Sequence, residues 1–256
     1  MKVKGRAWCA DLPVVTVKAG EPKHITIMYP YYCNPEFLRQ QVARWSTFHA
    51  SLRQHLSAMV VDDGSPEPAV DVLRDVALPF PVRLFRIGVD VRWNWLAARN
   101  IGFHHAPDGW CLVTDMDHVI PETTATAVVY GQHDPGVIYG FSRIESTGES
   151  VAAHPNSWLM TRAMFWTVGG YDETLSGHYG TDGDWRRRCQ ATAPMHILTD
   201  RLVRHEYQGD SSTRAYQRKQ PQDRRVSELI AARGKRWTPK TLSFPYEEIA
   251  LAGALV

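Results

Sequence analysis

The order of elements along this sequence predicts an α/β fold, in which helices cover both faces of a mostly parallel central sheet. Short apolar segments with strand composition alternate with segments whose apolar residues recur at helical spacing. The run from Trp110 to Val113 is continuously apolar, which is typical of a strand buried on both faces. No internal repeat interrupts the alternation, as expected for a sheet built from strand–helix units.

The first half of the chain divides into strands that are each followed by a helix. Residues 14–17 are expected to form a short edge strand and residues 24–29 the first core strand, followed by a loop at 30–33. Asn34 and Pro35 favour a helix start, because Asn is a frequent N-cap and Pro suits the first turn. Further strands are predicted at 57–61, 82–87 and 110–113, with helices after 65–66 and at 93–106.

The second half is predicted to contain a helix at 122–130, a strand at 137–141, a polar loop at 142–155 and a strand at 157–160. A short helix at 162–168 is ended by two glycines, and another helix is expected at 182–191. Short strands at 195–198 and 202–203 and a helix near 222–233 follow. These elements suggest an N-terminal extension (1–22), one domain (23–206) and a C-terminal extension (207–256).

Composition is ordinary for a globular protein, with 44% hydrophobic and 22% charged residues. No run of 18 apolar residues predicts a transmembrane helix, and the basic start lacks the apolar region of a secretory signal. The four cysteines, at positions 9, 33, 111 and 189, have no C-x-x-C spacing and are expected to be free thiols. These features predict a cytoplasmic protein.

Positive charge is concentrated near the C-terminus, although the net charge is only +2. Residues 201–240 contain 11 Lys or Arg and 4 Asp or Glu, whereas residues 1–200 contain 18 and 21. This basic segment could face a polyanion, a membrane surface or a bound diphosphate. The simpler alternative is that the basic residues form the solvated face of a helix and bind no partner.

Two carboxylates, Asp115 and Asp117, directly follow the buried strand. Alternate strand residues point to the same side, so both side chains are expected to converge at the carboxyl end, where α/β sheets bind ligands. A divalent cation relieves the repulsion between crowded carboxylates and prefers such oxygen ligands. The same pattern also fits a strand end followed by a helix cap. His118 is expected to point away from Asp117 if the strand continues.

Five short motifs occur in a fixed order along the chain. They are Val60-Val61-Asp62-Asp63-Gly64-Ser65, Arg99-Asn100-Ile101-Gly102, Asp115-Met116-Asp117, Gly169-Gly170-Tyr171-Asp172 and Tyr179-Gly180-Thr181-Asp182-Gly183-Asp184-Trp185. Each is weak alone, but the ordered set resembles the GT-A glycosyltransferases, most closely the family-2-like group, over about residues 24–206. The resemblance implies a Rossmann-like nucleotide-sugar half at 23–121 and an acceptor half at 122–206, with 207–256 as a basic extension.

The resemblance implies that Pro30, Tyr31 and Tyr32, together with Asp62 and Asp63, hold the base and ribose of a nucleotide. A carboxylate can accept a hydrogen bond from a base N–H, and a tyrosine ring offers a stacking face. One aspartate could instead close an Asx turn and cap a helix, which would leave the second aspartate unexplained.

Arg99 and Asn100 form the second motif, on a helix that is expected to face the same crevice. A guanidinium matches a phosphate bidentately, so Arg99 is a candidate donor-binding residue. A surface arginine on an amphipathic helix is the alternative. Asn100 accompanies it in the family and could simply orient a loop.

The resemblance makes Asp117 the better metal ligand and places Asp115 nearer to the ribose or sugar, with Mn²⁺ or Mg²⁺ as the cofactor. His205, after the last strand, matches the position of a third ligand, and an imidazole would favour Mn²⁺. The chain contains 11 histidines, so a chance placement of His205 is the alternative.

The last motif aligns Asp182 with the general base of the family, and Asp184 is the second candidate. A carboxylate there can take a proton from an acceptor hydroxyl as its oxygen attacks the anomeric carbon, which inverts that centre. Thr181 replaces the usual Glu, a departure that leaves the acceptor open. The simpler alternative is that Asp182 is a helix N-cap and Asp184 a favourable first-turn charge.

These patterns predict a metal-dependent, inverting glycosyltransferase that uses a nucleoside-diphosphate sugar, with a UDP-sugar as the expected donor. The acceptor could be a saccharide, a lipid-linked glycan, a protein or DNA. One alternative is a nucleotidyltransferase that makes a nucleotide sugar, although no Gly-rich signature is present around residues 25–34. The other is a nucleic-acid-binding module that uses the basic segment.

Overall fold

The computed structural model describes residues 8–204, 224–234 and 236–251. Its strands, in chain order, are β1 (Val14–Val15), β2 (Ile25–Tyr31), β3 (Leu56–Asp62), β4 (Val82–Ile87), β5 (Trp110–Val113), β6 (His118–Val119), β7 (Ile138–Glu145), β8 (Ser150–Val151), β9 (Trp158–Thr161), β10 (Met195–Arg204) and β11 (Tyr246–Ile249).

The helices within these ranges are α1 (Pro35–Ser46), α2 (Ala50–Arg53), α3 (Val70–Leu73), α4 (Trp95–His105), α5 (Glu122–Tyr130), α6 (Arg162–Val168), the 3₁₀ helix η1 (Glu173–Leu175), α7 (Asp182–Thr192) and α9 (Arg224–Ala231). None of the helices described is both long enough and apolar enough to cross a membrane.

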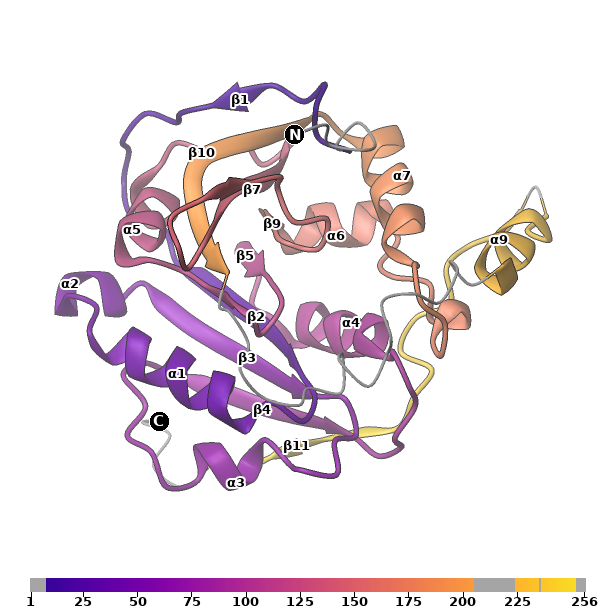
Figure 1. The fold of residues 1–256 in the computed structure, drawn as a ribbon, viewed down its shortest axis with the longest axis horizontal. Helices are drawn as coiled ribbons and strands as arrows, with labels where there is room; N and C mark the ends of the chain where they lie inside the picture. The colour runs from indigo at the N-terminus through magenta and orange to yellow at the C-terminus, as the bar shows by residue number, and fades with distance from the viewer. Residues whose placement is uncertain (1–7, 205–223, 235, 252–256) are drawn as a thin grey trace.

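One sheet runs through the described part of the chain, in the order β1-β10-β7-β9-β5-β2-β3-β4-β11, with β6 beside β10 and β8 beside β7 (Figure 1). The pairs of β2 with β3 and β5, β3 with β4, and β10 with β1 and β7 are parallel, and they contain most of the residue pairing. β9 lies antiparallel between β5 and β7 and joins the two halves of the sheet. The predicted α/β architecture with a mostly parallel sheet is therefore confirmed.

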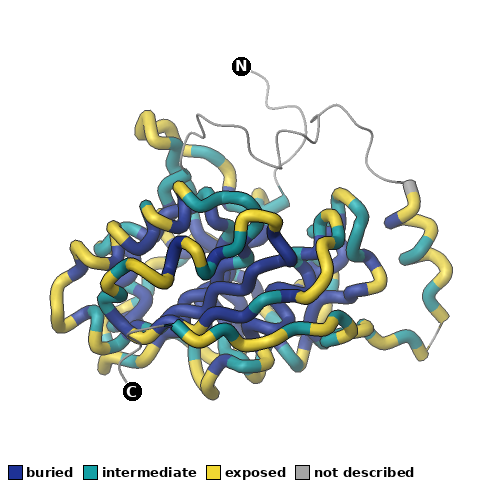
Figure 2. The backbone as a smooth tube through the Cα atoms, turned by 90° about the horizontal axis from the view of Figure 1, so that it is seen from below, coloured by how far each residue is buried: buried dark blue, intermediate teal, exposed yellow. Residues whose placement is uncertain are grey.

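Each face of the sheet carries its own apolar cluster. On one face α1 and α5 contribute residues such as Leu38 and Val128, and on the other α4, α6 and α7 contribute Phe103, Phe165 and Trp185. Figure 2 shows the buried strands at the centre of the molecule, with exposed segments around them. Burial on both faces explains why the core strands read as continuous apolar runs.

β2 continues through Pro30 to Tyr31, so the expectation that residues 30–33 leave the sheet is wrong for its first two residues. Alternate residues of a strand hydrogen-bond to opposite neighbours, and Pro30 faces the side of β5. β5 ends at Val113 beside Met28, so the missing N–H of Pro30 leaves no ladder bond unmade. The extension sets Tyr31 beside Asp62 at the carboxyl end of the sheet.

Three later strands also differ from expectation. β7 runs on to Glu145 and pairs with β8, so part of the segment expected to be a polar loop is a hairpin. β10 is one strand with a register shift between Leu198 and Arg201, where two short strands were expected. β11 was not predicted, because its half-exposed edge position gives no apolar pattern.

The predicted helix ends at Asn34 and Gly169 differ in outcome. α1 begins at Pro35 as expected, but the Asn34 side chain makes no cap and instead donates from Nδ2 to the Tyr32 carbonyl over 2.7 Å. α6 ends at Gly169, whose φ of 97° lies in the left-handed region that glycine adopts most easily.

Gly64 bends the chain after β3, and we predict that Gly64→Ala lowers the free energy of unfolding by about 3 kcal/mol or more. Its φ is +70°, and an added Cβ would lie 2.2 Å from the Val89 carbonyl oxygen, so backbone strain and a clash add together. Gly148→Ala is the matched control, because its φ is +88° but no heavy atom lies within 4 Å of the added Cβ. Urea unfolding should give it a loss of only about 1 kcal/mol. Equal losses for the two variants would contradict the clash.

Candidate functional site

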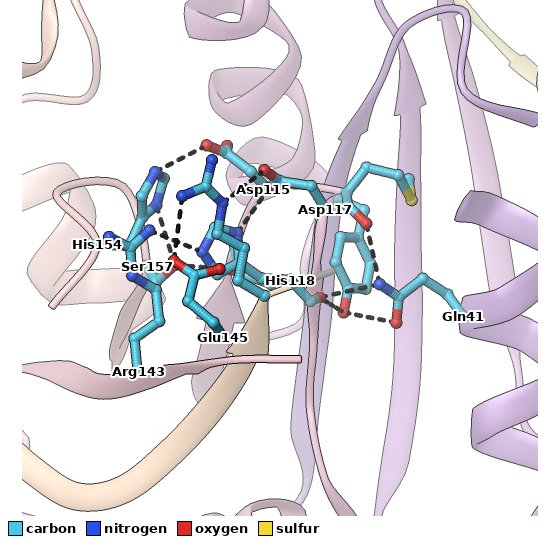
Figure 3. Close-up of polar contacts among 12 residues, drawn as sticks. Gln41, Asp115, Asp117, His118, Arg143, Glu145, His154 and Ser157 are labelled. Carbon is cyan, nitrogen blue, oxygen red and sulfur yellow. Dashed lines mark hydrogen bonds and ion pairs between the residues drawn. The ribbon is translucent and has the colours of Figure 1, made fainter. Parts of the chain in front are cut away.

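Asp115 and Asp117 follow β5 in a tight turn and not in a continued strand. The His118 N–H donates to the Asp115 carbonyl over 3.0 Å, which folds the chain back before β6. The expectation that strand alternation aligns the two carboxylates is therefore wrong. Both side chains nevertheless belong to one polar cluster (Figure 3), and they are 31% and 38% exposed. A ligand can reach both carboxylates.

Asp115 is held by Arg99, whose side chain has no exposed surface. Arg99 Nη2 donates to Asp115 Oδ1, Nη1 donates to the Tyr171 hydroxyl over 3.1 Å, and the guanidinium carbon lies 4.6 Å from the Trp95 ring centre. Burial raises the pKa of Asp115, and the Arg99 charge acts against that rise. The surface position considered for Arg99 is wrong, whereas its contact with a phosphate stays a prediction.

Asp117 is oriented by His118, so the expectation that this histidine points away is wrong. His118 Nδ1 lies 2.6 Å from Asp117 Oδ1, and Nε2 lies 3.3 Å from Arg143 Nη1. Arginine can only donate, so Nε2 accepts and Nδ1–H donates to Asp117. Burial acts to raise the pKa of Asp117, but the hydrogen bond from His118 and nearby positive charges hold it well below its usual value. Asp117 is therefore a carboxylate at neutral pH.

A second histidine, His154, was not singled out from the sequence, because it lies in the segment expected to be a polar loop. Its Nε2 is 3.5 Å from Asp115 Oδ2, and its ring packs on His118 with centroids 4.4 Å apart. Its Nδ1 lies 3.3 Å from the Ser157 hydroxyl, which in turn bonds to Thr114 over 2.7 Å. Burial and the neighbouring His118 hold the pKa of His154 well below its usual value, so a neutral ring borders Asp115.

Asp182 opens α7, and its charge reaches this cluster. Its Oδ1 accepts a hydrogen bond from Asn156 Nδ2 over 2.9 Å, and its negative charge acts to raise the pKa of both Asp115 and Arg99. The N-cap position is taken by Thr181, which makes no side-chain cap, so the alternative of Asp182 as N-cap is wrong. Asn156, between the expected polar loop at 142–155 and the expected strand at 157–160, was also not singled out from the sequence.

Asp184, two residues after Asp182 in the first turn of α7, has a different environment. Its side chain is 5% exposed, with Oδ2 accepting from Arg188 Nε over 3.1 Å and Oδ1 accepting from Arg233 Nη1. Both oxygens are therefore occupied, and this geometry favours Asp182 over Asp184 as the group that meets a substrate.

Asp62, at the end of β3, and Asp63, which follows it, have different surroundings. Asp62 Oδ1 accepts from the Ser65 N–H over 2.7 Å, and Oδ2 accepts from the Ala69 N–H over 2.9 Å and from Arg86 over 3.0 Å. Asp62 thus shapes the loop after β3. Asp63 is 4% exposed, and its Oδ1 has no hydrogen-bond partner among the described residues. It remains the candidate for meeting a ligand N–H.

Two tyrosines near this loop differ in accessibility. Tyr31 is fully buried, with its hydroxyl donating to the Glu67 carbonyl over 2.8 Å, so its ring offers no stacking face. Tyr32 is half-buried, and burial together with the Asp90 carboxylate, 3.1 Å from its hydroxyl, raises its pKa to about 12. Pro30, beside them, is also half-buried.

Within the described ranges no group of three or more His, Cys, Asp or Glu side chains could hold a metal ion. Asp115 and Asp117 supply two carboxylates, and His205, predicted as the third ligand, lies outside the described residues. The oxygen donors that are present suit Mg²⁺ or Mn²⁺. A complete ligand set therefore stays a prediction.

The family model "Glycosyl transferase family 2" matches residues 32–189, more than half of the chain. The chain belongs to glycosyl transferase family 2. The matched range contains Asp62, Asp63, Arg99 and the three acidic residues of the cluster, Asp115, Asp117 and Asp182. Pro30, Tyr31 and His205 lie outside it.

Two solved structures share the fold of this family 2 chain. Residues 1–349 of TarS from S. aureus, in complex with UDP-GlcNAc, give a TM-score of 0.58 at 14% identity over 73% of this chain and 60% of that chain. The mannosyltransferase PcManGT from Pyrobaculum calidifontis, in complex with GDP-Man and Mn²⁺, gives a TM-score of 0.58 at 15% identity. The match covers 84% of this chain and 64% of that chain. The family 2 chain thus spans less than two thirds of either protein. No curated protein sequence matches it.

Asp63→Asn and Asp62→Asn should have opposite effects on the stability of this family 2 domain. Burial raises the pKa of Asp63 well above its usual value, with the Asp62 charge contributing. The wild-type fold therefore loses stability as pH rises from about 4 through that raised pKa. The Asp63→Asn variant has no carboxyl group there to titrate, so its stability should not fall in this way. Its free energy of unfolding should therefore increase relative to that of the wild type as pH rises.

Asp62→Asn should instead lower the free energy of unfolding by about 1–3 kcal/mol at every pH, because an amide NH₂ cannot accept from two backbone N–H groups. Urea unfolding at pH 4, 5.5 and 7 measures both variants. A loss for Asp63→Asn that does not change with pH would show that Asp63 has a partner at its buried oxygen.

Proposed function

We propose that this family 2 chain transfers a sugar from a nucleoside-diphosphate sugar to an acceptor hydroxyl, with inversion at the anomeric carbon and with Mn²⁺ or Mg²⁺ as cofactor. The observation that carries the proposal is the common cluster of Asp115, Asp117 and Asp182. These residues come from the turn after β5 and the start of α7, yet the charges of Asp117 and Asp182 both act to raise the pKa of Asp115. Family membership and the nucleotide-sugar complexes of TarS and PcManGT support it.

The metal would be held by Asp117 first, since this carboxylate is anionic and 38% exposed. Asp115 would contribute Oδ2, because Arg99 already occupies its Oδ1. His205 completes the proposed ligand set, and an imidazole favours Mn²⁺ over Mg²⁺. When bound, the cation would neutralise charge on the departing diphosphate.

The nucleotide would lie against the loop after β2 and the loop after β3. The half-buried ring of Tyr32 offers a stacking face, and the unpartnered oxygen of Asp63 can accept from a base or ribose group. Asp62, Tyr31 and Pro30 shape these loops. We propose a UDP-sugar as the donor, and a GDP-sugar is the alternative that the same loops could hold.

Asp182 is the proposed general base. Asn156 donates a hydrogen bond to one oxygen of its carboxylate, and the other oxygen would accept the proton. The acceptor hydroxyl would pass its proton to Asp182 as its oxygen forms a bond to the anomeric carbon and the bond to the diphosphate breaks. Attack from the face opposite the leaving group inverts the anomeric centre. Thr181, in place of the family's Glu, leaves the class of acceptor open.

Family membership favours transfer from a nucleotide sugar over synthesis of one, which was the first alternative from the sequence. The nucleic-acid alternative depends on the basic segment at 201–240, half of which (residues 205–223 and 235) lies outside the described ranges. An acceptor that is a saccharide, a lipid-linked glycan, a protein or DNA is compatible with the proposed chemistry.

We predict that UDP raises the melting temperature by several degrees only when Mn²⁺ is present, and that Asp117→Ala abolishes this rise. Saturation at about 100 times Kd corresponds to about 2.7 kcal/mol of stabilisation. Asp108→Ala is the matched control, since this aspartate lies at the opposite end of β5 and is 94% exposed. GDP and TDP are tested in parallel. A rise that is equal without metal would contradict the metal assignment.

Asp182→Asn should lower the rate of nucleotide release from the donor by about 10²–10⁴-fold, because the amide cannot accept the proton. The UDP- and Mn²⁺-dependent thermal shift should remain, since Asp182 is not among the proposed ligands. Release of nucleotide from UDP-, GDP- and TDP-sugars with water as acceptor measures the rate without knowledge of the acceptor. Wild-type rates in the variant would exclude Asp182 as the base.

A further inference from the structure

Two buried carboxylates in the acceptor half are bridged by one guanidinium from the C-terminal segment. Arg233, which follows α9, donates from Nη2 to Asp172 Oδ2 over 2.6 Å and from Nη1 to Asp184 Oδ1. Asp172 is 1% exposed and Asp184 is 5% exposed. Carboxylates buried to this degree need a partner, and a planar guanidinium can serve two at fixed geometry.

The guanidinium of Arg233 is itself held in place. Its carbon lies 3.7 Å from the centre of the Trp237 ring, and its side chain is 12% exposed. The backbone N–H of Arg233 donates to the Ile230 carbonyl over 3.2 Å, which fixes the residue at the end of α9. Arg233 is therefore a rigid contact and not a mobile surface charge.

Asp184 is held from a second side by α7 and the loop after α6. Arg188 Nε lies 3.1 Å from Asp184 Oδ2, and Arg188 Nη1 donates to the carbonyls of Val168 and Gly170 over 3.0 and 2.6 Å. The two arginines together fix the rotation of the first turn of α7. That turn also carries Asp182, which accepts a hydrogen bond from Asn156.

The segment that carries Arg233 is also held by hydrogen bonds from its backbone to two buried carboxylates, Asp172 and Glu173. Asp172 Oδ1 accepts from the Lys240 N–H over 3.2 Å, and Glu173 accepts from the N–H groups of Leu242 and Ser243 over 2.8 and 2.7 Å. Glu173 also accepts from Asn100 Nδ2 over 2.7 Å, and Asn100 is the neighbour of Arg99 on α4. These hydrogen bonds thus connect the C-terminal segment to α4, which carries Arg99, and to α7, which begins with Asp182.

We propose that Arg233 is a positioning residue for the reaction, because its bridge between Asp172 and Asp184 sets the direction of Asp182. This proposal rests on the proposed role of Asp182 as the base. Arg233 lies outside the range 32–189 that matches the family model, so the device is a feature of this chain's C-terminal segment. A shift of the base by about 1 Å is enough to cost roughly a hundredfold in rate.

The test is nucleotide release from the donor by the full chain carrying Arg233→Gln or Arg233→Lys. The glutamine variant loses the charge and should reduce kcat about a hundredfold, with the KM for the donor within about twofold. The lysine variant keeps the charge but reaches one carboxylate only, and should recover part of the loss, to about tenfold below the wild type. The lysine variant also serves where the glutamine variant fails to fold.

Arg83→Gln is the matched control. Arg83 also ties the C-terminal segment to the domain, through bonds to Glu248 of 2.7 and 2.9 Å, but it lies on β4, and its hydrogen bonds among the described residues are to Glu248 and to the His105 carbonyl and not to α7. It should leave kcat within about twofold of the wild type. An equal loss in Arg83→Gln, or a folded Arg233→Lys with unchanged kcat or with the loss confined to KM, would overturn the positioning role. An unchanged kcat in Asp182→Asn would overturn the base assignment, and the positioning role with it.

Discussion

The ion pair between Arg99 and Asp115 is the constraint on which the rest of the site depends. A fully buried guanidinium is costly unless it is paired, and its partner here is the first carboxylate after β5. The pair fixes α4 against the end of the central strand, while Tyr171 and Trp95 pack around the charge. Because Arg99 also donates to the Tyr171 hydroxyl, any movement of the loop after α6 away from α4 would remove a hydrogen bond from this buried charge.

The acidic residues of the chain are divided by environment, although they look equivalent in the sequence. Both carboxylate oxygens of Asp62 accept hydrogen bonds from loop N–H groups, and both oxygens of Asp184 are paired with arginines. Asp117 is kept anionic by His118, and Asp182 accepts a hydrogen bond from Asn156 alone among the described residues. A carboxylate with free lone pairs in a partly buried cluster can act on a ligand, whereas a saturated one serves the fold.

The C-terminal segment is part of this arrangement and not an appended tail. α9 and β11 flank a stretch whose backbone is held by the buried side chains of Asp172 and Glu173, and β11 extends the sheet beside β4. The family match ends at residue 189, so Asp172 and Asp184 lie within the matched range, whereas their partner Arg233 lies outside it. The contact between this segment and the helix that begins with Asp182 therefore involves a residue beyond the range that the family model matches.

The sequence by itself determined most of the strands and helices in their order, the fold class, and the family, because apolar periodicity and ordered short motifs are local properties. It also placed Asp115, Asp117 and Asp182 near element ends. Only the tertiary structure decided which aspartates are free, because that depends on partners distant in sequence, such as Arg233 for Asp184 and Asn156 for Asp182. His154 and β11 carry no local pattern, so their places follow only from the packing of the whole chain.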